Sequence, residues 1–122
     1  MVTKIDRRLY DVELAVSCMN KRKIEYPSFY NFLCAHFHMD WKCDFDSFDD
    51  AVDDYINDSS KESLVGLADD IGAILSLELD EEELDIFLLS FRNHYLVWRE
   101  SAKPIKVWLF ELANKLYEHA YS

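Results

Sequence analysis

The chain has only two glycines and two prolines among its 122 residues, and this scarcity limits its possible folds more than any other feature. Tight β-hairpin turns rely on glycine, so a strand-rich architecture would lack the residues that its turns need. Apolar residues instead recur at three- and four-residue spacing in one segment after another. We therefore predict an all-α fold, a single compact domain of five or six helices joined by short loops.

Five segments combine a helix start signal with an apolar stripe. Two start at a proline, which loses no hydrogen bond in a first turn, and three start at a serine or aspartate that can cap the helix. The start signals are Pro27, Ser47 with Asp50, Ser59 with Glu62, Asp80 with Glu83, and Pro104. The stripes behind them form the predicted core: Phe29, Phe32, Leu33, His36 and Phe37; Phe48, Val52, Tyr55 and Ile56; Leu64, Leu67, Ala68, Ile71, Ile74 and Leu75; Leu84, Phe87, Leu88 and Phe91; Ile105, Trp108, Leu109, Leu112 and Leu116.

Two glycines, Gly66 and Gly72, lie inside the stripe that begins at Leu64. Each costs about 1 kcal/mol relative to alanine in a helix interior. We therefore predict that a neighbouring helix packs closely at both positions.

Residues 1–25 precede the first start signal, and we interpret them as an N-terminal extension to a domain over residues 26–122. Apolar residues from Ile5 to Met19 fall at helical spacing, whereas those from Tyr10 to Cys18 alternate as in a strand. A lone strand would have no pairing partner in this chain, so we predict a helix that packs on the domain.

Charge is concentrated in the middle of the chain. The net charge is −11, and residues 31–90 contain seventeen acids and two bases. Direct binding of DNA or RNA needs clustered cations, so this balance argues against it and favours a basic partner or simple solubility. The start of the chain is charged and no apolar run approaches about 18 residues, so we expect a cytoplasmic protein without a membrane span.

Four residues near the middle, His36, His38, Asp40 and Cys43, are of types that bind zinc. Residues two apart on a helix point about 200° from one another, so His36 and His38 cannot share an ion, and we expect His38 to bond the chain where its helix ends. Apolar neighbours should keep the thiol of Cys34 inert. We expect no enzyme activity, no metal and no cofactor; a metal or redox module on His38, Asp40 and Cys43 is the alternative.

Residues 26–56, YPSFYNFLCAHFHMDWKCDFDSFDDAVDDYI, carry a family resemblance when taken as a whole. An aromatic, leucine-rich helix leads into FHMDW at residues 37–41, and a serine-opened helix with AV and DYI follows at residues 47–56. LSLELDEEELDIFL at residues 75–88 adds a leucine segment, an acidic turn and the next helix. Over about residues 26–118 the chain resembles the immunity proteins of bacterial contact-dependent growth inhibition systems.

The resemblance implies a cytoplasmic protein that binds the C-terminal toxin domain delivered by a neighbouring cell. Many such toxins are nucleases, and the family carries no catalytic residue or required cofactor. The matching positions His38, Asp40, Trp41 and Ser47 are expected to hold the fold together.

Taken with the acidic block, the resemblance predicts a stoichiometric acidic inhibitor of a basic toxin domain. We predict that the toxin contacts an acidic face with an aromatic anchor, where Trp41 could alternatively complete the core. The predicted contact residues are Trp41, Asp44, Asp46, Asp49, Asp50, Asp53, Asp54 and Tyr55. A second possible face is the group of acids from Asp80 to Asp85. The alternative functions are a nucleic-acid mimic that blocks another protein and a helical scaffold that binds another basic protein.

Overall fold

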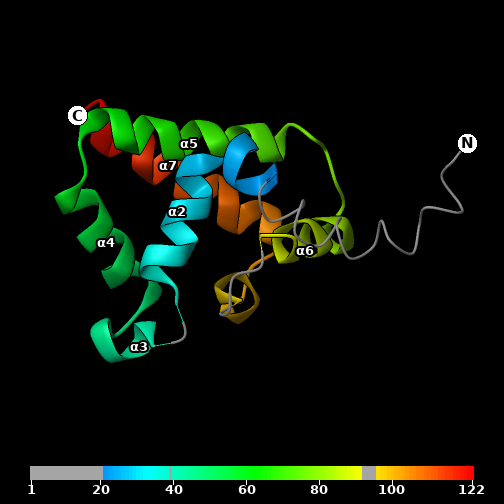
Figure 1. Ribbon diagram of the computed structural model, residues 1–122, viewed down its shortest axis with the longest axis horizontal. Helices are drawn as coiled ribbons and strands as arrows, with labels where there is room; N and C mark the ends of the chain where they lie inside the picture. The colour runs from blue at the N-terminus through cyan, green and yellow to red at the C-terminus, as the bar shows by residue number, and fades with distance from the viewer. Residues whose placement is uncertain (1–20, 39, 92–95) are drawn as a thin grey trace, which may run out of the picture.

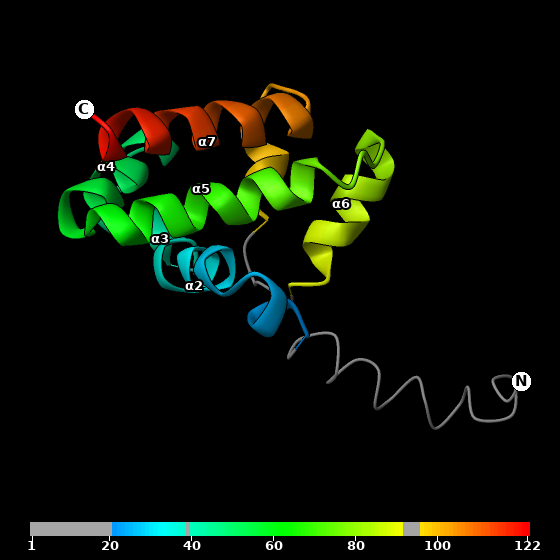
Figure 2. The same cartoon turned by 90° about the horizontal axis from the view of Figure 1, so that it is seen from above.

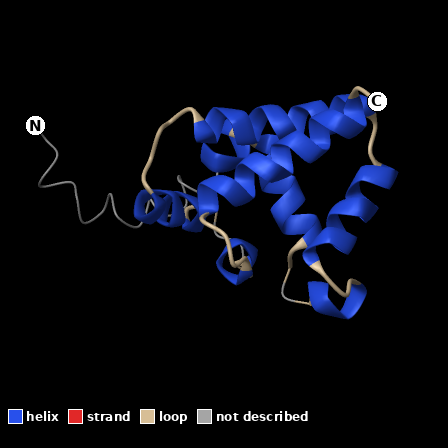
Figure 3. Cartoon of the chain, turned by 180° about the vertical axis from the view of Figure 1, so that it is seen from behind, coloured by secondary structure: helices blue, strands red, loops and turns tan. Residues whose placement is uncertain are grey.

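The computed structural model describes residues 21–38, 40–91 and 96–122, and this part of the chain consists of helices and loops without a strand (Figures 1 and 3). The helices are α2 (Pro27–His36), α3 (Trp41–Asp44), α4 (Phe48–Asp58), α5 (Lys61–Leu75), α6 (Glu81–Leu89), the 3₁₀ helix η1 (Val97–Glu100) and α7 (Ile105–Ala120). The all-α prediction is confirmed. The helix number is slightly higher than predicted because α3 and η1 are single turns, too short to show an apolar period.

Two long antiparallel helices, α5 and α7, lie side by side in the centre of the fold (Figures 1 and 2). Helix α2 packs against α5, and α6 contacts α7. Helices α3 and α4 lie at one end of the molecule and α6 lies at the other (Figure 1). The acidic middle of the sequence is therefore divided between two distant ends.

The helix expected between residues 5 and 20 lies outside the described residues, and the division of the chain after residue 25 stays a prediction. Residues 21–25 are helical and contact the end of α6. Arg22 Nε donates to Ser90 Oγ at 2.6 Å, and the guanidinium carbon of Arg22 lies 4.5 Å from the centre of the Phe87 ring.

The predicted apolar stripes form the core. Each of the five stripes supplies fully buried side chains, and its remaining members are partly buried against them. Trp98 of η1 is also buried, although no periodic pattern marked it, and its Nε1 donates to Asp85 Oδ1 at 2.8 Å. An indole needs such a partner when it is buried.

Two of the three predicted local caps are confirmed. Ser47 Oγ accepts from the backbone N–H of Asp50 at 3.1 Å, and Asp80 and Glu83 form a reciprocal capping box. The third prediction is wrong by one residue, since Ser60 caps α5 and Ser59 ends α4. Both serines precede the apolar stripe, so the sequence pattern fits either of them. The sequence predicts an end near residues 39–41 for the helix from Pro27, and the helix ends earlier, at residue 36.

The two helices that begin at a proline have no side-chain cap of their own and are capped by carboxylates from other helices. Asp70 of α5 accepts the backbone N–H groups of Ser28 and Phe29 at 2.9 and 3.0 Å through its Oδ2 atom. Glu81 of α6 accepts the N–H groups of Ile105 and Lys106 at 2.6 and 3.0 Å. Orphan N–H groups of a first turn need such partners.

The two helical glycines have different surroundings. A Cβ atom at Gly66 would lie 3.0 Å from Ser28 Oγ, so the predicted close approach of a neighbouring helix, α2, is confirmed there. A Cβ atom at Gly72 would meet nothing within 4 Å, so the same prediction is wrong for Gly72.

This difference predicts opposite outcomes for alanine substitution. Gly72→Ala should raise the free energy of unfolding by about 1 kcal/mol, because alanine is the better helix former and the space is open. Gly66→Ala should give clearly less, and Ser28→Ala in the same chain should restore the gain. Denaturant unfolding of the three variants measures this, and equal gains from the two single substitutions would contradict it.

The cap of α2 leads to a second prediction. Asp70→Ala should lower the free energy of unfolding by about 1–2 kcal/mol, a typical loss for a helix cap. Burial, opposed by the two backbone hydrogen bonds, raises the pKa of Asp70, so its ionised form is disfavoured on folding. The stability associated with this carboxyl therefore falls as pH rises through the raised pKa.

Asp70→Asn keeps an acceptor oxygen without the charge, so we expect it to match or exceed the wild type at pH 7. The wild type should approach this variant as the pH is lowered through the pKa of Asp70. Thermal unfolding between pH 3 and 7 measures the difference, and equal losses from the alanine and asparagine variants would contradict it.

Candidate functional site

One end of the molecule carries a long acidic segment that is almost free of bases. Residues 40–58, which span α3 and α4, contain eight aspartates and a single lysine. All eight aspartates are exposed, whereas Ala51, Val52 and Ile56 of α4 face the core. We name these eight residues the acidic surface: Asp40, Asp44, Asp46, Asp49, Asp50, Asp53, Asp54 and Asp58.

Three members of the acidic surface have cationic or histidine neighbours. Asp53 Oδ1 lies 2.9 Å from Lys115 Nζ of α7. Asp54 and Asp44 each lie 3.6 Å from a histidine Nε2, that of His36 and His38 respectively. Exposed pairs of this kind contribute little stability, typically below about 1 kcal/mol. The surface keeps a strong net negative charge despite them.

Helix stability alone does not favour this arrangement of aspartates. Asp49 with Asp53, and Asp50 with Asp54, are like charges four residues apart, which destabilise a helix by about 0.2–0.5 kcal/mol per pair. Asp58 lies in the last turn, where the helix dipole disfavours an anion. Because these charges destabilise their own helix, folding does not explain them, and a role in binding is favoured.

The other acidic segment, from Asp80 to Asp85, is used by the fold itself. Asp80 and Glu83 form the capping box of α6, and Glu81 caps α7. Asp85 accepts from Arg99 Nε at 2.9 Å and from the buried indole of Trp98, and the Arg99 bond above all lowers the pKa of Asp85. These bonds make this segment a weaker candidate for a partner than the acidic surface.

The two aromatic residues predicted as anchors lie largely inside the protein. Trp41 is 3% exposed and packs 5.0 Å from the ring centre of Phe37. Tyr55 is partly buried against Phe32, with ring centres 5.1 Å apart, and desolvation raises its pKa. The structure therefore gives Trp41 the core role that its sequence left open, with almost no area to offer a partner.

His38 and Asp40 of the FHMDW segment lie between α2 and α3. The backbone N–H of Asp40 donates to Nδ1 of His38 at 3.1 Å, which confirms that His38 bonds the chain beyond the end of its helix. Within the described residues, no three histidine, cysteine, aspartate or glutamate side chains gather as metal ligands would. Cys34 is exposed, contrary to the apolar setting expected for it, although desolvation still raises the pKa of its thiol.

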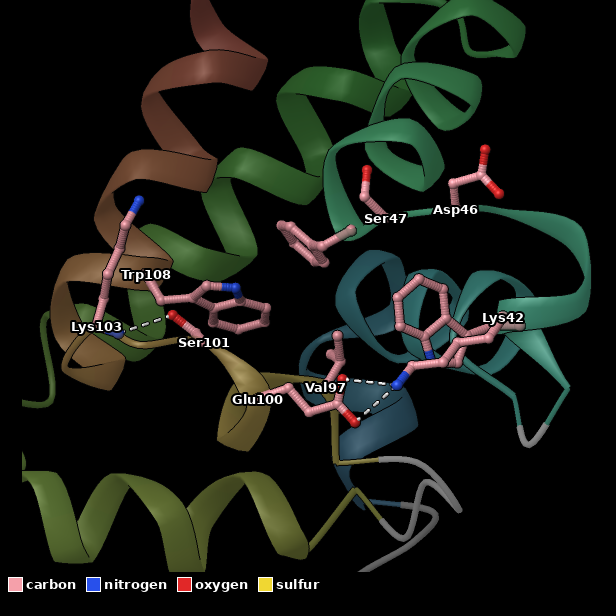
Figure 4. A pocket seen from close by; sticks show the side chains of 10 residues that line it. Lys42, Asp46, Ser47, Val97, Glu100, Ser101, Lys103 and Trp108 are labelled. Carbon is pink, nitrogen blue, oxygen red and sulfur yellow. Dashed lines mark hydrogen bonds and ion pairs between the residues drawn. The ribbon is translucent and has the colours of Figure 1, made fainter.

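A groove beside the acidic surface separates α3 and α4 from η1 and the start of α7 (Figure 4). Its main cavity has a volume of about 350 Å³, and Lys42 Nζ lies 3.1 Å from Glu100 Oε1 across it. A smaller cavity of about 190 Å³ lies between α4 and α7 and shares Phe48, Lys103 and Trp108 with the first. Sequence reasoning missed this groove because its walls come from segments far apart in the chain.

A family model described as CdiI immunity protein matches residues 25–116. This chain belongs to that family. It is a toxin-neutralising immunity protein, a class that acts by binding a cognate toxin and is generally not enzymatic. The comparisons with curated proteins and with solved structures find no match.

The match includes both segments that carry the resemblance, residues 26–56 and 75–88. Among the described residues, no helix of this immunity protein is long and apolar enough to cross a membrane.

Proposed function

We propose that this immunity protein is a stoichiometric inhibitor of a nuclease, the C-terminal toxin domain of its cognate contact-dependent growth inhibition effector. Its acidic surface on α3 and α4 covers the basic face of the toxin. The exposure of all eight aspartates there is the observation that carries the proposal.

The negative charge of the acidic surface suits a nuclease as the partner, because a nuclease must present cations to a phosphate backbone. An inhibitor with the opposite potential is steered toward that face, so its association rate is higher than that of two neutral surfaces. A typical complex buries about 800 Å² per partner, roughly a tenth of the 7684 Å² surface of this chain. A contact of that size would include the acidic surface together with its surroundings.

The proposal predicts a tight one-to-one complex in the cytoplasm. The tagged C-terminal domain encoded immediately upstream should retain this chain stoichiometrically during purification, and its nuclease activity should fall to zero at one equivalent. Retention should weaken as salt is raised in the washes. Absence of retention at low salt would overturn the proposal and favour a nucleic-acid mimic or a scaffold that binds another basic protein.

The acidic surface can be tested separately from the rest of the chain. Asp50→Asn with Asp54→Asn should slow association with the toxin domain several-fold at low ionic strength, and the difference should shrink with added salt. Glu78→Gln with Glu82→Gln is the matched control, since it also changes the net charge from −11 to −9 but near α6. Stopped-flow association rates measure both. Equal slowing by the two pairs would show that net charge, and not this surface, guides the encounter.

A further inference from the structure

The acidic surface supplies charge but no apolar centre for an interface. No large apolar side chain is exposed within residues 40–58, where the aromatic residues are partly or fully buried. A stable complex buries about 800 Å² of accessible surface on each partner, and its centre is more apolar than its border. An apolar contact would therefore come from an element next to α4.

Few large apolar side chains are exposed in the described residues. Those that are exposed are Ile24, Leu77, Ile86, Leu89, Val107, Phe110 and Tyr121. The first four belong to α6 or the segments next to it, far from α4 (Figure 1). Tyr121 already stacks with Tyr117 and has Lys61 Nζ 4.6 Å from its ring centre. Val107 and Phe110 remain.

These two side chains are neighbours on the outer face of α7. They are three residues apart, a spacing that places them on one side of a helix, and they are 39% and 57% exposed. Together with Lys106, Glu111 and Asn114 they line one shallow, mainly apolar depression.

This depression shares one lining residue with the smaller cavity between α4 and α7. Glu111 lines both the depression and the smaller cavity between α4 and α7, whose opposite wall includes Asp49. Two ion pairs include residues that line this smaller cavity: Lys103 with Glu111, and Lys115 with Asp53. A partner that covers both α4 and the outer face of α7 would contact the acidic surface and this depression together.

We propose that Val107 and Phe110 form the apolar anchor of the toxin interface, and that the partner surface is an apolar recess bordered by lysine or arginine side chains. This inference rests on the proposed function and names the contact that charge does not supply. Charge complementarity selects the partner, since the exposed aspartates of α4 favour cations on the side of the recess that faces α4.

An anchor and a charged border act on different rate constants. Aromatic side chains at the centre of an interface, surrounded by polar contacts that exclude water, supply most of the binding energy and slow dissociation. Exposed charges mainly raise the association rate. The two parts of the surface can therefore be separated by kinetics.

Phe110→Ala should raise the dissociation rate of the complex with the tagged toxin domain about tenfold or more, with the association rate unchanged. Ile86→Ala is the matched control, because Ile86 is an exposed apolar side chain, 61% exposed, on α6 at the other end of the molecule. It should leave both rates unchanged. Surface plasmon resonance with the full chain measures the association and dissociation rate constants of both variants. Thermal unfolding should show that neither variant is destabilised.

The outcomes are distinguishable. If the wild type binds and the aspartate variants slow association, but Phe110→Ala dissociates at the rate of Ile86→Ala, the anchor proposal is wrong and the proposed function stands. If the wild type itself does not bind the toxin domain, both proposals are overturned.

Discussion

The helix arrangement depends on two carboxylates that serve helices other than their own. Pro27 and Pro104 set the first turns of α2 and α7, but neither helix has a capping side chain beside it. Asp70 and Glu81 supply the missing acceptors from α5 and α6. Because the first N–H groups of a helix have no partner within it, these bonds fix where α2 and α7 begin relative to α5 and α6. A local feature of the sequence, a proline without a cap, thus becomes a tertiary constraint.

This use of carboxylates divides the acidic residues into two populations. One population accepts hydrogen bonds from backbone N–H groups, an indole or a guanidinium, so its charge is part of the fold; its members in α5 and α6 are Asp70, Glu81, Glu83 and Asp85. Those of α4 beyond its first turn face water and destabilise their own helix. The net charge of the sequence does not distinguish these two populations of acids. The contacts of each carboxylate in the folded structure distinguish acids that serve folding from acids that remain available for binding.

Sequence pattern predicted those features of the fold that depend on neighbours within one helix. The apolar stripes, the capping box of Asp80 and the cap at Ser47 are all set by residues at most four apart. It failed where the partner is distant, as for Asp70, or where a single turn such as η1 carries a buried residue like Trp98. Gly66 and Gly72 look alike in sequence, and only the position of α2 distinguishes them.

The same limit applied to the candidate site. The aspartates of α4 were found from sequence because they are charged and close together in the chain, and all of them are exposed. The role of Trp41 was left open, since an aromatic residue in a polar segment suits both a core and an interface. Sequence pattern did not reveal the exposed pair on α7, because Phe110 directly follows two core residues, Trp108 and Leu109, and resembles them.

Electrostatic attraction cannot by itself make an inhibitor specific for one nuclease. Every polyanion in the cell, above all RNA, is drawn to the same basic face, and salt weakens all of these contacts alike. Specificity is a difference between affinities, so it requires contacts that a phosphate backbone lacks. An exposed aromatic side chain beside the acidic surface is such a contact, because its burial adds affinity that does not depend on charge. In the proposed complex the aspartates would set how quickly the toxin is met, and Phe110 would determine that this protein, rather than nucleic acid, stays bound.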